Sequence, residues 1–166
     1  TGPLIRREEP YHYMTIDERR QILYKMRMFF LHTPILHTTI KINRKEANDK
    51  FSLTSHLSKC LKSYINKHYE YFTSFEKIIV YYDNGQQELN LVLNTIFSLL
   101  LSNVEFRKAS PLEYRLLQLA DYICSLELLS IKLSGKRLSK SEKAFFYKPQ
   151  ELKKTFIKSI KTKELL

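Results

Sequence analysis

The stretch EKIIVYYDNGQQELNLVLNTIFSLLLSNVEFRK, residues 76–108, decides the fold class. Its apolar run at 77–82 ends in Asp83-Asn84-Gly85, and such a run closed by a turn is typical of a strand covered on both faces. Residues 87–101 then show apolar side chains at helical spacing, and residues 103–108 predict a second strand. Strand, helix and strand in this order predict an α/β layer fold with a partly parallel sheet.

The flanking sequence extends this alternation in both directions. We predict a helix over 15–31, which opens with a Thr15/Glu18 capping box. A strand over 35–42, rich in β-branched residues, and a long helix over 52–72 follow. Downstream, Pro111 begins a helix that runs to about Leu133. Three strands make a thin sheet, so we expect further strands before Thr1.

The charge of the chain is concentrated in its C-terminal part. Residues 131–166 hold ten Lys and one Arg against three Glu, in a chain of net charge +11. We predict two parts, an α/β domain over 1–134 and a basic helical appendage over 135–166. A basic surface favours nucleic acid, although a solvated lysine-rich tail has the same composition. The candidate phosphate contacts in this segment are Lys136, Arg137, Lys153 and Lys154.

Two aspartates are candidates for chemistry. Asp83 ends a predicted strand, and functional groups collect at the carboxyl ends of strands in open α/β sheets. Asp83 could instead form the turn or cap the next helix. Asp121 lies within QLADYICSLELL, residues 118–129, where we expect a buried helix. A buried carboxylate requires a partner, either a lysine or backbone donor, or a divalent metal ion.

Two carboxylates that meet at a sheet edge suit Mg²⁺ or Mn²⁺, because these ions prefer oxygen ligands. Such a site can activate water and stabilise the leaving oxygen when a phosphodiester is cleaved. We therefore predict that Asp83 and Asp121 lie close enough to share a metal ion. The histidines show no metal-ligand spacing, and no motif supports a Cys–His nucleophile.

Residues 76–129, from EKIIVYYDNG to QLADYICSLELL, resemble the domain-of-unknown-function 3800 family, and the opening TGPLIRRE resembles another segment of that family. Members of the family are similar to the RNase H-like superfamily. The resemblance implies a mixed sheet flanked by helices and an acidic site for two metal ions, with Asp83 as the strand-end aspartate and Asp121 as the aspartate of the last helix. Arg6 and Arg7 would contact phosphate or form an ordinary solvated loop. The first strand of the family, with its D-E-S-G-type motif, has no counterpart here, so we expect an incomplete domain.

These observations favour a metal-dependent nuclease acting on DNA or RNA. The alternative is a non-catalytic nucleic-acid-binding or scaffold module of a mobile-element or defence assembly. No apolar run is long enough to span a bilayer, so no membrane partner is expected. Cys60 and Cys124 fall in apolar helical patterns and predict reduced core residues, which fits the cytoplasm. We expect self-association or association with the missing N-terminal segment.

Overall fold

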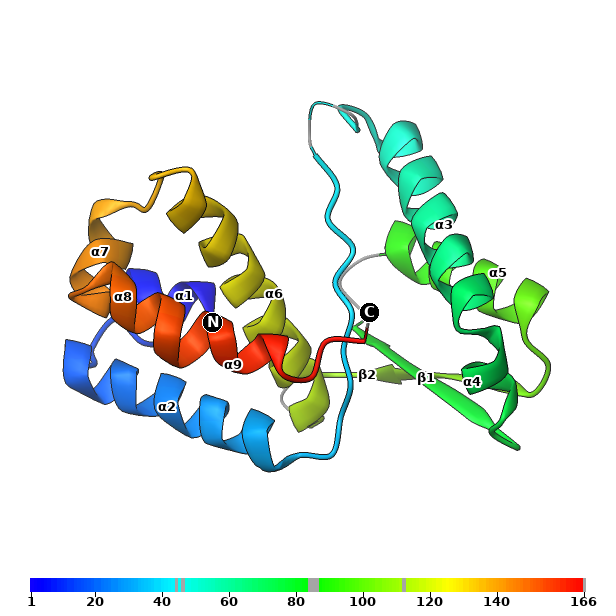
Figure 1. Cartoon of the computed structure of the whole chain (residues 1–166), viewed down its shortest axis with the longest axis horizontal. Helices are drawn as coiled ribbons and strands as arrows, with labels where there is room; N and C mark the ends of the chain where they lie inside the picture. Colours follow the sequence, from blue (N-terminus) through cyan, green and yellow to red (C-terminus); the bar gives the residue numbers. More distant parts are fainter. Residues whose placement is uncertain (44, 46, 84–86, 112, 166) are drawn as a thin grey trace. The chain divides into compact units, whose positions relative to one another are not determined.

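The computed structural model describes residues 1–43, 45, 47–83, 87–111 and 113–165, and the chain divides into two compact units (Figure 1). The first unit combines residues 1–39 with 118–166, and the second comprises residues 40–117. The fold is mixed α/β, mostly helical with one two-stranded parallel sheet. The α/β class predicted from residues 76–108 is therefore confirmed.

The second unit contains the sheet and follows the predicted order of elements. These are α3 (Lys50–Lys67), α4 (Tyr69–Thr73), β1 (Ile78–Asp83), α5 (Gln87–Leu100) and β2 (Val104–Ala109). Strands β1 and β2 pair in parallel, from Ile78 opposite Val104 to Asp83 opposite Ala109. Asn84 and Gly85 of the predicted turn lie outside the described residues.

One face of this sheet packs against helices. The core of the unit consists of buried Leu61, Ile65, Val92 and Leu101 from α3, α5 and the residue after it, and the paired Ile78 and Val104 pack against this cluster. Because side chains alternate along a strand, Ile79, Tyr81, Glu105 and Arg107 belong to the opposite face. Ile79 there is 38% exposed, so the prediction of a strand covered on both faces is wrong.

The first unit is helical. Its elements are α1 (Gly2–Arg6), α2 (Ile16–His32), α6 (Arg115–Ser134, from Gln118 onward), α7 (Lys140–Phe146), α8 (Pro149–Glu151), the π-helix η1 (Leu152–Ile157) and α9 (Lys158–Lys161). The capping box of α2 forms as predicted, because the Thr15 hydroxyl accepts from the Glu18 amide and Glu18 accepts from the Thr15 amide. Ser139 and Glu142 form a second capping box on α7.

The C-terminal segment belongs to the core of this unit. One cluster of buried side chains joins α1, α2 and α6 to residues after Gly135, which contribute Leu138, Phe145, Phe146, Leu152, Phe156, Ile157 and Ile160. The structure therefore divides the chain elsewhere than at the predicted boundary of 134/135, and the segment is not an appendage. Its lysines lie beside an apolar stripe at helical spacing, and that stripe requires a partner surface.

The predicted strand over 35–42 is wrong. Only one isolated bridge forms there, between His37 and Glu164, where the amide of His37 donates to the Lys163 carbonyl and the amide of Leu165 donates to the His37 carbonyl. The β-branched residues favour an extended backbone, but a strand also requires a neighbour with which to pair. That neighbour is a property of the tertiary structure and is not encoded locally.

Within the described residues, none of the helices combines the length and the apolar character needed to cross a membrane.

Candidate functional site

A pocket of about 410 Å³ opens at the carboxyl ends of the two parallel strands. Asp83, Lys108, Ala109, Ser110 and Glu113 line it. Because β1 and β2 run parallel and in register, Asp83 and Ala109 end at the same edge of the sheet. This is the edge at which open α/β sheets bind ligands, so the structure places the sequence-predicted Asp83 in a cavity.

Local hydrogen bonds fix both strand ends. The side-chain amide of Asn90 on α5 donates to the Asp83 carbonyl oxygen (3.1 Å), which ties the end of β1 to the following helix. After β2, the amides of Glu113 and Tyr114 donate to the Ser110 carbonyl oxygen at 3.0 and 2.9 Å. This turn brings Glu113 back to the pocket that Asp83 lines.

The pocket therefore combines two carboxylates with one ammonium group. Carboxylate oxygens suit Mg²⁺ or Mn²⁺, and Mg²⁺ is commonly held by one or two carboxylates together with water and substrate phosphates. Asp83 and Glu113 fit that donor set, and Lys108 offers a positive charge for a phosphate. Among the residues that the structure describes, no group of three or more His, Cys, Asp or Glu side chains is arranged to hold a metal ion.

Sequence reasoning missed Lys108, Ser110 and Glu113. The sequence did contain a signal for this site. Lys108 ends the predicted strand over 103–108 and ASPLE follows it, as Asp83 follows the strand over 77–82, and parallel strands end at one edge of a sheet. The predicted start of a helix at Pro111 concealed it. The helix in fact begins at Arg115, and Ser110 and Glu113, which precede it, line the pocket.

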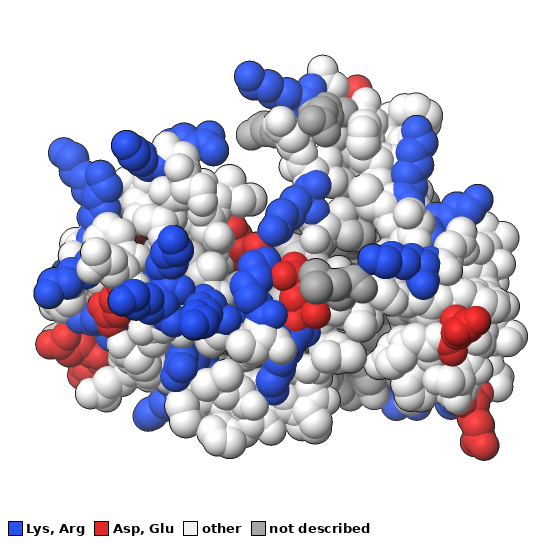
Figure 2. Space-filling view, in the orientation of Figure 1, with Lys and Arg blue, Asp and Glu red and all other residues white. Residues whose placement is uncertain are grey.

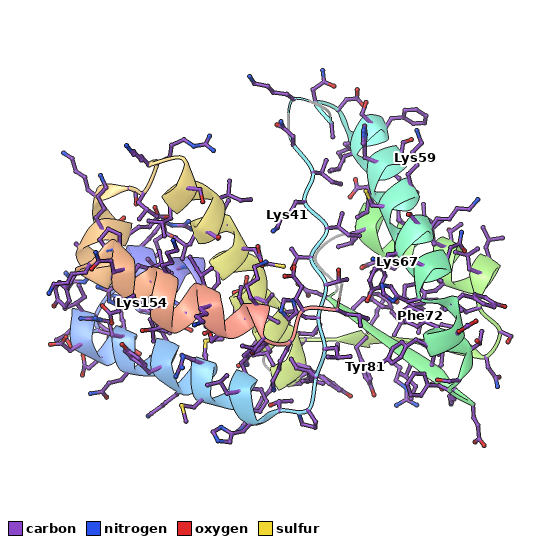
Figure 3. All side chains as sticks on the ribbon, in the orientation of Figure 1. Lys41, Lys59, Lys67, Phe72, Tyr81 and Lys154 are labelled. Atoms are coloured by element: carbon purple, nitrogen blue, oxygen red, sulfur yellow. The ribbon has the colours of Figure 1, made fainter. Side chains whose placement is uncertain are left out.

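Two tyrosines and an arginine lie next to this pocket. The rings of Tyr81 on β1 (labelled in Figure 3) and Tyr114 have centroids 4.8 Å apart and an interplanar angle of 36°. Arg107 Nη1 donates to the Tyr81 hydroxyl (3.0 Å), and Arg107 Nε donates to Glu105 Oε1 (2.5 Å). Hydrogen bonds from Arg107 and then from Lys77 lower the pKa of Glu105 from its ordinary 4.5 to about 2.

Asp121 is not the buried carboxylate of α6. Its side chain is 61% exposed and pairs with the amino group of Thr1. The buried carboxylate of the same helix is Glu127, which is 3% exposed and accepts a hydrogen bond from Lys161 Nζ (2.6 Å). Six residues turn a helix through about 240° beyond one full turn, so the two carboxylates lie on different faces.

The structure gives Asp83 and Asp121 different surroundings. Asp83 belongs to the second unit and Asp121 to the first. Their predicted metal-bridging distance stays a prediction.

Arg6 and Arg7 both bond within their own loop. Arg6 forms two hydrogen bonds to the Glu8 carboxylate, at 2.8 and 2.9 Å. Arg7 Nε donates to the His12 carbonyl oxygen (2.9 Å). Both side chains are exposed, but Glu8 already neutralises the charge of Arg6.

The first unit carries most of the positive charge. It holds seventeen Lys and Arg against nine Asp and Glu, a net charge of +8, whereas the second unit has a net charge of +3. Figure 2 shows Lys and Arg side chains gathered over the helices of the first unit. Lys136, Arg137, Lys153 and Lys154 are all exposed, and their contact with phosphate stays a prediction.

Three other lysines of the first unit bond to protein groups. Lys132 Nζ donates to buried Glu142 (2.6 Å), and Lys161 pairs with Glu127. Burial raises the pKa of Glu142, but hydrogen bonds from Lys132 and Ser139 outweigh it and hold the pKa below its usual range. Lys163 Nζ donates to the carbonyl oxygens of Phe30, Leu31 and Thr33 at the end of α2, at 2.6 to 2.9 Å.

Cys60 and Cys124 are free and exposed, so the expectation that they are core residues was wrong. Each is adjacent in sequence to a buried residue, Leu61 or Ile123. A shift of one residue rotates a helical position by about 100°, which is enough to carry the thiol out of the core.

Comparisons of the chain with protein-family models, curated proteins and solved structures found no match. The resemblance to the domain-of-unknown-function 3800 family accordingly stays a prediction.

Proposed function

We propose that the chain binds the phosphate backbone of nucleic acid through exposed cations of its C-terminal helices. One observation carries the proposal. Eight exposed Lys and Arg side chains form no ion pair within the described part of the chain, namely Lys136, Arg137, Lys140, Lys143, Lys148, Lys153, Lys154 and Lys158. Cations without internal partners are available to displace the counterions that surround a polyanion.

The helical core makes these cations a fixed array. Lys153 and Lys154 follow buried Leu152 on η1, and Lys158 follows Ile157. Lys154 is labelled on this helical run in Figure 3. Lysines contact phosphate as point charges without reading base sequence. The expected partner is therefore any nucleic acid, bound with strong salt dependence.

The test pairs two double variants of equal charge. Lys153→Gln/Lys154→Gln removes two cations from the proposed surface, and Lys59→Gln/Lys67→Gln removes two exposed cations from α3 of the second unit. Binding of a labelled duplex is measured by anisotropy across a salt series. Each lost phosphate contact should reduce the slope of log K against log salt by about 0.9. Equal losses in both variants would show that net charge, and not this surface, governs binding.

A second candidate function is metal-dependent phosphodiester hydrolysis by an RNase H-like domain, favoured by the pocket at the strand ends. Asp83 and Glu113 would hold Mg²⁺ or Mn²⁺, and Lys108 would offset charge on the phosphate. Such an ion, when bound, activates water and stabilises the leaving oxygen. The predicted RNase H-like arrangement would instead pair Asp83 with Asp121.

Three variants separate these arrangements. Cleavage of DNA, RNA and hybrid substrates is measured with Mg²⁺ or Mn²⁺ for Asp83→Asn, Glu113→Gln and Asp121→Asn, each of which keeps the side-chain shape and removes the charge. If the pocket is the active site, Asp83→Asn and Glu113→Gln lose activity and Asp121→Asn retains it. If Asp83 and Asp121 hold the metal ion together, Asp121→Asn loses cleavage activity as well. If the wild-type protein cleaves none of the substrates, the remaining candidate is a non-catalytic nucleic-acid-binding module.

A further inference from the structure

The aromatic pair and the strand-end pocket are parts of one surface. Tyr81 precedes Asp83 by two residues, so both side chains belong to the same face of β1 and are about 7 Å apart along the strand. Tyr114 directly follows Glu113, and Glu113 lines the pocket. The two rings, which are tilted by 36° to each other, therefore lie beside the pocket, and we call them the rim.

This rim is accessible and held in place. Tyr114 is 39% exposed, and the Arg107 side chain is 43% exposed. Arg107 donates to the Tyr81 hydroxyl and is itself held by Glu105, which Lys77 also contacts. A ring that is already fixed loses little conformational freedom when a ligand stacks on it.

Apart from the partly exposed Ile79, the open sheet face carries charged and aromatic side chains. It presents Lys77, Glu105 and Arg107 together with the two tyrosines, so an occupant should be planar and polar at its edges. A nucleobase meets both requirements, because every base has a π face and hydrogen-bonding edges. Beside it, the pocket sets Lys108 among the Asp83 and Glu113 carboxylates, which can accept hydrogen bonds from the hydroxyls of a sugar.

We propose that the Tyr81–Tyr114 rim stacks an unpaired nucleobase while the adjoining pocket takes the sugar of the same nucleotide. The chain then prefers single-stranded nucleic acid to duplex, because a base inside a duplex is already stacked on both sides. The pocket volume of about 410 Å³ lies within the range of small-molecule sites. This inference rests on the proposed function in taking the polyanion to be nucleic acid.

A fluorescent variant tests the stacking directly. The chain contains no tryptophan, so Tyr114→Trp introduces a single reporter at the rim. AMP and dAMP should quench its emission, whereas ribose 5-phosphate, which carries the phosphate without a base, should not. Equal responses to all three ligands, or none to any, would overturn the inference.

Affinity measurements on the full chain provide the second test. Tyr114→Ala should weaken binding of a single-stranded oligonucleotide by about fivefold to a hundredfold, the usual effect of losing one stacking ring. Tyr114→Phe keeps the ring and should bind within about twofold of the wild type. Binding of an abasic oligonucleotide of equal length should be the same in all three proteins. Tyr13→Ala, at a tyrosine 72% exposed in the first unit, controls for the loss of any surface ring.

Circular dichroism confirms that each variant is folded, and Tyr114→Phe keeps the test decisive if Tyr114→Ala unfolds. Loss of affinity in Tyr114→Phe, or an equal loss for abasic and normal strands, would refute stacking.

The two proposals can fail separately. Salt-dependent binding that depends on Lys153 and Lys154 but is equal for abasic and normal strands supports the basic surface and overturns the rim. Quenching by AMP, together with oligonucleotide affinity that is insensitive to the lysine substitutions, supports the rim and overturns the basic surface.

Discussion

The two units use their side chains differently. Among the residues that the structure describes, the first unit buries sixteen in one cluster, drawn from both ends of the sequence, whereas the cluster of the second unit has four. The first unit also buries the Glu127 and Glu142 carboxylates, each paired with a lysine, while the second leaves the Arg107 and Glu105 side chains 43% and 37% exposed on its sheet. In the first unit the large core encloses these carboxylates, whereas in the second unit the polar side chains of the open sheet face are accessible to a ligand.

The largest effect should come from deleting residues 136–166. The deletion removes seven of the sixteen buried residues of the first unit, and each buried Phe or Leu contributes about 2–5 kcal/mol. The sum exceeds the usual stability of a domain, so the first unit should unfold. Circular dichroism and limited proteolysis would show this loss. Residues 1–39 that stay protease-resistant would contradict the shared core.

A single truncation in the same core sharpens the contrast. Phe156→Ala removes a ring that is 2% exposed and should lower the free energy of unfolding by about 3–5 kcal/mol. Phe51→Ala in the second unit removes a ring that is 85% exposed and should change it by less than about 0.5 kcal/mol. Chemical denaturation measures both. Similar losses would mean that Phe51 is covered in solution.

Two carboxylates on α6 provide the next comparison. Glu127→Ala removes the buried partner of Lys161 and should cost about 1–3 kcal/mol. Asp121→Ala removes an exposed ion pair, which is worth at most about 1 kcal/mol. Thermal and urea unfolding of the two variants would rank them. A larger loss of unfolding free energy for Asp121→Ala than for Glu127→Ala would show that Asp121, and not Glu127, is the carboxylate that stabilises α6.

The smallest effect concerns the pH dependence of the second unit. Because Arg107 and Lys77 lower the pKa of Glu105 to about 2, the folded state binds that proton less readily than the unfolded chain. The stabilisation is therefore present above pH 4.5 and is lost as the pH falls towards 2. Glu105→Gln should flatten this part of the stability profile, measured by acid titration. An identical profile in the variant would show that the pair is screened by solvent.

The order of strand, helix and strand was predictable because it depends on local periodicity. Ile78–Asp83, Gln87–Leu100 and Val104–Ala109 all agree with the pattern of their own residues to within about two positions. Asp83 could be assigned to a ligand-binding edge for the same reason. Glu113 was missed because a helix was predicted to begin at Pro111, whereas the amides of Glu113 and Tyr114 donate to the Ser110 carbonyl in a turn.

The orientation of polar residues on the helices was not predictable. Asp121 and Glu127 lie in the same apolar stretch, yet the first is exposed and the second buried. Helical spacing shows which residues share a face, but it cannot say which face a distant segment will cover. Lysines of the C-terminal segment all look alike in sequence, although some are exposed and others bind carboxylates or the end of α2.

The sequence by itself determined the α/β class, the capping of α2, the strand-end position of Asp83 and the charge of the C-terminal segment. Each depends on neighbouring residues, so a short window contains the information. Only the tertiary structure decided that this segment completes a core, that Lys161 bonds to buried Glu127 and that Lys163 bonds to the end of α2. Lys163 reaches the Phe30 carbonyl across 133 residues of sequence. Contacts at that separation arise from the packing of whole helices, which buries apolar surface together with any polar group that can still find a hydrogen-bonding partner.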